Sequence, residues 1–100
     1  MNVDSFRRLV SSVAERPGMY MLTLGEYGSL ALGYAAALRD AGVVEGLLTD
    51  EFSEWLCARE QAPNVGWVAH IQRRYGDGEA AIKEAGGFWA EWFDARAGTA

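Results

Sequence analysis

With 100 residues, the chain is long enough for one domain with a modest hydrophobic core. Half of the residues are hydrophobic, which argues against disorder over most of the chain. Nine lysines and arginines against fourteen aspartates and glutamates give a net charge of −5, so the chain lacks the basic surface that nucleic-acid binding requires.

The number of cysteines and the length of the apolar runs indicate in which cellular compartment the protein resides. Cys57 is the single cysteine, so no internal disulfide can form. Residues 1–4 lack the basic and apolar regions of a signal peptide, and no apolar run reaches the roughly 18 residues of a membrane span. We therefore expect a cytoplasmic protein that does not enter a membrane.

A short amphipathic helix is predicted over residues 3–14, with Asn2 or Asp4 as its N-cap. Its apolar stripe consists of Val3, Phe6, Val10 and Val13. Pro17-Gly18 fits the centre of a type II turn and ends this helix. An extended apolar segment is predicted after the turn, a linker that could pair as a short strand. Its apolar residues are Met19, Tyr20, Met21, Leu22 and Leu24.

Two helices are predicted in the middle of the chain. The first covers residues 27–41 and ends at Gly42, a natural residue for a helix C-terminus. Its predicted face is Leu30, Tyr34, Leu38 and Ala41, and Gly33 predicts tight packing at that point. The next helix has Thr49 as its N-cap and runs to about residue 61. It buries Phe52, Trp55 and Leu56.

Two more helices are predicted towards the C-terminus. Asn64 caps a helix over residues 65–75, whose inward face is Trp67, Val68, Ile71 and Tyr75. The last helix covers residues 78–96 and carries Phe88, Trp89, Trp92 and Phe93, which share one broad face at i, i+1, i+4 and i+5. The pattern predicts an all-α fold: residues 1–100 as a single-domain bundle of about five helices, with the C-terminal rings in its core.

Four acidic residues gather around the start of the third predicted helix. They are Glu45, Asp50, Glu51 and Glu54. Asp50 and Glu54 share a helix face, and acids in a first turn already have a helix-dipole explanation. Three interpretations stay open: a patch that binds a basic partner, a pair of carboxylates for acid–base chemistry, and a solvated surface.

A second candidate site is an aromatic pocket near the single histidine. Its predicted residues are Tyr20, Trp67, His70 and Trp89. His70 borders the inward face of its helix and is the one candidate base for Cys57, although no local signature supports that pair. A zinc site would need further histidines or paired cysteines, so we predict no metal and no cofactor.

Two resemblances are visible in the motifs. Arg16-Pro17-Gly18-Met19-Tyr20 resembles a motif of the ATP-binding domain of type II topoisomerase B subunits, but the rest of that domain's signature has no counterpart here. The order of motifs over nearly the whole chain resembles a family of small actinobacterial proteins of uncharacterised activity. The shared motifs are the Arg-Pro-Gly-Met-Tyr run, Gly33-Tyr34, Phe52-Ser53-Glu54-Trp55, Trp67 and residues 88–93. Leu22 stands where that family usually has glycine.

The leading interpretation is a non-enzymatic protein-binding module with a basic protein partner. Its size and acidity are similar to those of immunity proteins that neutralise bacterial toxins, one concrete version of this role. A small ligand-binding protein or biosynthetic enzyme with an aromatic pocket near His70 is the first alternative. A structural homodimer subunit is the second.

Overall fold

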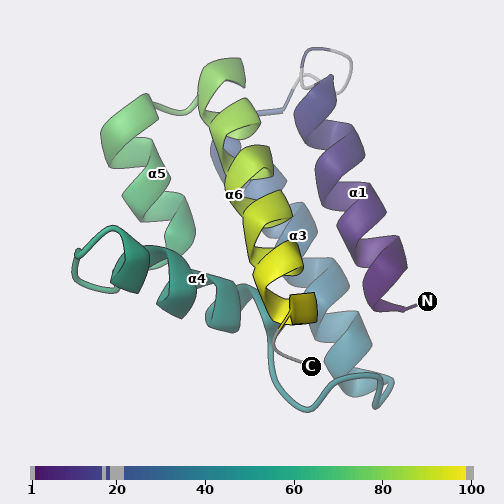
Figure 1. The fold of residues 1–100 in the computed structure, drawn as a ribbon. Helices are drawn as coiled ribbons and strands as arrows, with labels where there is room; N and C mark the ends of the chain where they lie inside the picture. Colours follow the sequence, from purple (N-terminus) through teal and green to yellow (C-terminus); the bar gives the residue numbers. More distant parts are fainter. Residues whose placement is uncertain (1, 17, 19–21, 99–100) are drawn as a thin grey trace.

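Five α-helices make up the regular structure of the part of the chain that the computed structural model describes, residues 2–16, 18 and 22–98 (Figure 1). They are α1 (Val3–Glu15), α3 (Leu24–Asp40), α4 (Leu48–Arg59), α5 (Trp67–Tyr75) and α6 (Glu79–Gly98). No strand occurs in these ranges, so the prediction of an all-α bundle is confirmed. Most of the predicted extended segment, at residues 19–21, lies outside the described residues.

Helix α6 runs through the middle of the bundle and contacts each of the other four helices. In Figure 1 it stands between α1 and α5, with α3 behind it and α4 crossing below. The Cα radius of gyration is 12.7 Å, as expected for one domain of this length. None of the described helices is long and apolar enough to cross a membrane.

Trp89, Trp92 and Phe93 lie in the core, as predicted, whereas Phe88 is half-buried against it. Trp89 is fully buried, and its ring stacks on Phe52 of α4 with 3.8 Å between the ring centroids. Phe6 of α1 and Trp67 of α5 contact the same indole, with centroids at 5.3 and 5.5 Å. One side chain of α6 therefore joins three other helices through aromatic contacts.

Helix α3 begins at Leu24, so the prediction that this residue is extended is wrong. The reason is a capping box. The Thr23 hydroxyl accepts a hydrogen bond from the backbone N–H of Glu26, and the Glu26 carboxylate accepts one from the backbone N–H of Thr23. These two bonds start the helix three residues earlier than predicted.

The buried face of α3 also differs from the predicted one. Leu30 is 40% exposed and Ala41 is exposed, whereas Tyr27 and Ala31 are buried. The buried face of α3 consists of Leu24, Tyr27, Gly28, Ala31, Ala35 and Leu38, so the predicted face is right at Leu38 and wrong at Leu30 and Ala41. Gly33 has open space where a β-carbon would be, so the tight packing predicted there is also wrong.

The starts of α4 and α5 differ from the predictions as well. Leu47 is the N-cap of α4, so Thr49 is a first-turn residue and not the cap. Asn64 accepts a hydrogen bond from the backbone N–H of Gly66 at 3.1 Å, and this local turn delays the start of α5 to Trp67. Gly66 is the N-cap, and its φ of 93° favours glycine. At the other end of α5, Tyr75 is exposed and not inward-facing.

Candidate functional site

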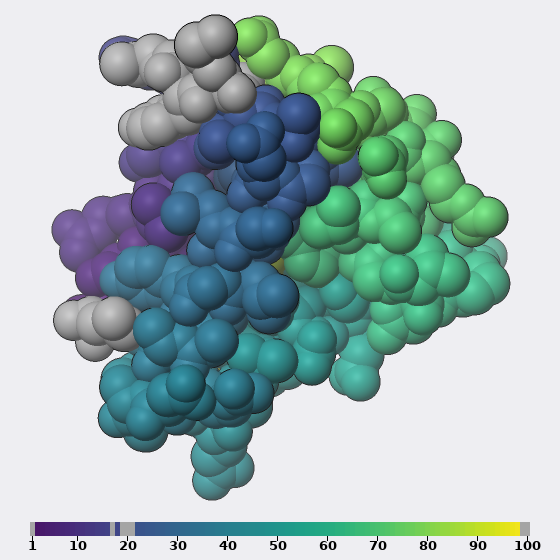
Figure 2. All heavy atoms as spheres, turned by 180° about the vertical axis from the view of Figure 1, so that it is seen from behind, coloured from purple at the N-terminus to yellow at the C-terminus, as the bar shows by residue number. Residues whose placement is uncertain are grey.

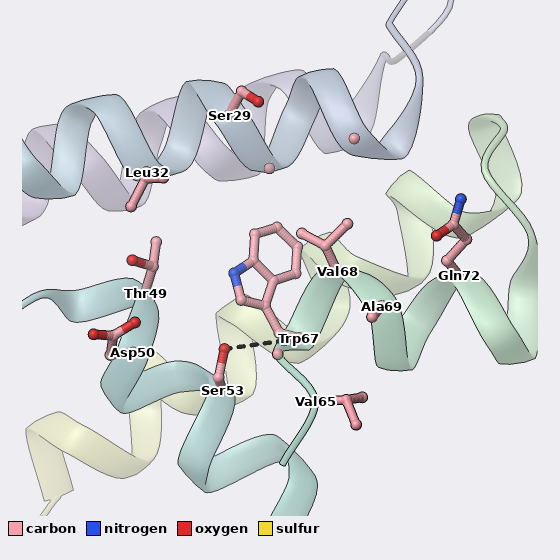
Figure 3. Close-up of a pocket in the computed structure, with 13 residues that line it drawn as sticks. Ser29, Leu32, Thr49, Asp50, Ser53, Val65, Trp67, Val68, Ala69 and Gln72 are labelled. Carbon is pink, nitrogen blue, oxygen red and sulfur yellow. Dashed lines mark hydrogen bonds between the residues drawn. The ribbon is translucent and has the colours of Figure 1, made fainter.

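A groove of about 480 Å³ lies between α3 on one side and α4 and α5 on the other (Figure 3). Its floor is Trp67, the first residue of α5, which is 4% exposed. Leu32 of α3 and Val65 of the loop before α5 flank the groove, and each is 48% exposed. Figure 2 shows this face of the molecule, where α3 (blue) meets α5 (green).

The groove follows from small residues on one face of α3. Gly25, Gly28 and Ser29 line it together with Leu32, at the i, i+3, i+4 and i+7 positions of a helix face. Gly28 lets α3 approach α5, because a β-carbon at Gly28 would lie 2.5 Å from Cγ2 of Val68. The small side chains therefore leave the space that the groove occupies.

Contacts with neighbouring side chains fix the position of Trp67 at the floor of the groove. The backbone N–H of Trp67 donates to the Ser53 hydroxyl at 3.0 Å, which supplies the cap that Gly66 cannot. The ring of Tyr27 meets the Trp67 indole edge to face, and its hydroxyl donates to the carbonyl of Val10 at 2.8 Å. Burial raises the pKa of the Tyr27 hydroxyl well above its ordinary value, so it stays protonated.

Two polar groups at the groove have no hydrogen-bond partner among the described residues. The hydroxyl of Thr49 is buried and unpartnered. The indole nitrogen of Trp67 makes no hydrogen bond to another described residue, and Figure 3 shows it pointing towards Thr49. Both groups lie at the end of the groove that is lined by α4.

The four predicted acidic residues are all exposed, but they face different parts of the surface. Asp50 lines the groove. Glu45 and Glu51 line a separate hollow together with Arg96, and Glu54 lies one turn beyond Asp50 on α4. None of the four carboxylates forms an ion pair with a described residue. The structure therefore places one of the four, Asp50, at the groove itself.

The described members of the predicted aromatic pocket do not line one cavity. Trp67 and Trp89 are in contact, but Trp89 is fully buried in the core behind the groove floor. His70 does not line the groove; its Nε2 lies 3.5 Å from a carboxylate oxygen of Glu60. Tyr20 lies outside the described residues. Among the described members of this predicted set, Trp67 is the one that lines the groove.

The chemistry of the groove suits binding. Among the described residues that line it, Asp50 is the single titratable one. A serine or threonine nucleophile needs an adjacent base that is itself oriented, and no histidine, cysteine or lysine lines this groove. Cys57, the other candidate nucleophile, is 1% exposed within α4. Across the described ranges, no three histidine, cysteine or carboxylate side chains come together as metal ligands.

Leu32 and Val65 were not predicted as site residues. The sequence pattern that could have indicated the groove is Gly25, Gly28, Ser29 and Leu32 on one helix face, because three of these four side chains are too small to fill a core.

Comparisons with protein-family models, with curated proteins and with solved structures gave no significant match.

Proposed function

We propose that this chain is a non-enzymatic protein-binding domain whose partner docks on the groove between α3, α4 and α5. One observation carries the proposal: Leu32 and Val65, two aliphatic side chains that are each 48% exposed, stand on either side of an indole floor. Exposed apolar side chains grouped around a groove are typical of a surface that a partner covers. Trp67 is itself 4% exposed and forms the floor, so the surface that a partner covers comes mainly from Leu32 and Val65.

Charge supports a basic partner. The chain has a net charge of −5, and Asp50 at the groove carries no ion pair with a described residue. Glu54 lies one turn along the same helix face. Unpaired carboxylates beside an apolar groove attract a cationic protein and orient it during encounter. Association should accordingly slow as the salt concentration rises.

Neutralisation of a toxin is one concrete version of this role. The small size and acidity of the chain support it, as does a docking face that would cover a basic surface on a toxin. The order of motifs supports membership of the small actinobacterial family described above. A neighbouring gene for a toxin, and survival of toxin-expressing cells only when this chain is co-expressed, would establish the toxin-neutralising role.

A small-ligand role is the second candidate, and it is favoured by the unpartnered hydroxyl of Thr49. A volume of about 480 Å³ is within the range of small-molecule sites. The half-exposed flanks, Leu32 and Val65, are less suited to that role, because a small molecule would leave them in water. A compound that co-purifies with the chain and is lost on Thr49→Val would favour this candidate.

The test is affinity capture from a lysate of the source organism with matched variants as bait. Leu32→Glu puts a charge on the flank of the groove, and Leu30→Glu puts the same charge on an exposed residue of α3 that does not line it. The proposal expects a protein that wild type and Leu30→Glu retain and Leu32→Glu loses. A captured protein that Leu32→Glu and Asp50→Lys both retain would place the docking face elsewhere and overturn the proposal.

A further inference from the structure

We propose that the segment of the partner that enters the groove is a basic amphipathic helix. One of its aliphatic side chains lies on Trp67 between Leu32 and Val65, and a lysine or arginine on its edge pairs with Asp50. This inference rests on the proposed function and adds the chemistry of the partner.

The walls of the groove favour a helix as the occupant. They come from α3, α4, α5 and the loop before α5, so they offer side chains and helix ends and no strand edge. Binding by strand addition is excluded here, because it needs the free edge of a strand and the described residues contain no strand. A segment that enters an apolar groove must satisfy its own backbone groups, which a helix does.

The apolar anchor is defined by the residues around the indole. Leu32, Val65 and Val68 line the groove with Trp67, from three different parts of the chain. Leu32 and Val65 are about half exposed, so a side chain between them covers surface that water contacts in the free protein. An aliphatic side chain of the partner gains most from this position, because a polar one would lose its water there.

The charge next to the groove defines the edge of the partner helix. Asp50 lines the groove and Glu54 follows at i+4, and neither forms an ion pair with a described residue. Two cationic side chains at i and i+4 of a partner helix would match them. A second copy of this chain is a poor occupant, because its net charge of −5 would repel the same carboxylates.

Synthetic peptides of about 15 residues provide the probe. One has leucine on one helix face and lysine on the other; a second replaces lysine by glutamate, and a third replaces leucine by serine. Each is titrated into the ¹⁵N-labelled full chain while the indole N–H signals of its four tryptophans are followed by NMR. The spectrum of Trp67→Phe assigns the signal of Trp67.

The expected result is that the leucine–lysine peptide shifts the Trp67 indole signal and the amides of Val65 and Val68. The glutamate and serine peptides should bind at least about tenfold more weakly. Leu32→Glu and Asp50→Lys should each weaken the leucine–lysine peptide by about tenfold or more. The matched controls are Leu30→Glu and Glu84→Lys, exposed residues that do not line the groove, and they should bind as wild type does. Val65→Glu serves in place of Leu32→Glu if the latter loses its helical circular dichroism.

Four outcomes would overturn the inference. The peptide with serine in place of leucine could bind as tightly as the leucine–lysine peptide, which would show that the interaction is purely ionic. The shifts could centre on the hollow at Glu45 and Glu51. The wild-type chain could self-associate through the groove, with Leu32→Glu dissociating it, which would make a second copy the occupant. If none of the peptides binds but the captured natural partner is still lost on Leu32→Glu, the helix inference fails and the protein-binding function stands.

Discussion

Gly28 of α3 and Val68 of α5 approach so closely that a β-carbon on Gly28 would lie 2.5 Å from Cγ2 of Val68. This contact fixes the distance between the two helices beside the groove. It also explains why a glycine is tolerated inside α3 despite its low helix propensity. The groove therefore depends on the absence of a side chain at this position.

The first prediction concerns this contact. Gly28→Val should lower the free energy of unfolding by about 1–3 kcal/mol, because the added methyl groups force α3 away from α5. Gly33→Ala is the matched control on the same helix. It has open space at its β-carbon and should gain up to about 1 kcal/mol from helix propensity. Urea unfolding followed by circular dichroism measures both. A Gly28→Val variant as stable as wild type would show that the helices are not in this contact.

The second prediction concerns the centre of the core. Trp89→Ala should lower the free energy of unfolding by about 3–5 kcal/mol, because its ring contacts Phe52, Phe6 and Trp67 and has no exposed surface. Phe88→Ala, at the half-buried neighbouring position, should cost clearly less. The same urea titrations measure this difference. Equal losses at the two positions would argue against a core centred on Trp89.

The third prediction concerns two hydroxyls in successive turns of α4. Thr49→Val should stabilise the fold by about 1 kcal/mol, because it removes a buried hydroxyl that has no partner. Ser53→Ala should destabilise it by about 1 kcal/mol, because the Ser53 hydroxyl accepts the backbone N–H of Trp67. Thermal and urea unfolding of the two variants would show the opposite signs. A loss of stability on Thr49→Val would mean that its hydroxyl has a hydrogen-bond partner in solution.

The fourth prediction concerns pH. The pKa of Tyr27 is raised by burial in the folded state, so the folded chain holds the phenolic proton more tightly than the unfolded chain does. The resulting stabilisation is complete below the unfolded pKa of about 10 and is lost as the pH rises above it, at up to about 1.4 kcal/mol per pH unit. Urea unfolding at pH 8 and pH 11 measures the loss. Tyr27→Phe should remove this part of the pH dependence; an unchanged slope in the variant would contradict the assignment.

Residue periodicity was sufficient to predict the architecture. The ring spacing at Trp89 and Trp92 and the apolar stripe of α1 at Phe6 and Val10 each place several side chains on one face, and both faces are buried. These patterns extend over several turns, so a shift of one residue at a helix end does not hide them. The sequence therefore predicted the helices and the centre of the core correctly.

Helix starts were harder to predict, because each depends on a few competing hydrogen bonds. Thr23 and Glu26 have the spacing of a capping box, yet the apolar run before them favoured an extended segment. Threonine is a favourable N-cap residue, but the N-cap of α4 is Leu47 and not Thr49. The groove was not predicted at all, because it depends on how closely Gly28 brings α3 to α5, which a single sequence does not specify.

Calorimetric titration of the purified natural partner into wild type, Leu32→Glu and Leu30→Glu tests the central claim most directly. If the groove is the docking face, Leu32→Glu weakens binding by about tenfold or more, while Leu30→Glu, which alters a similarly exposed leucine two residues away, leaves the Kd within about twofold. Equal affinities for all three chains would contradict the claim that the partner covers Leu32 and Trp67.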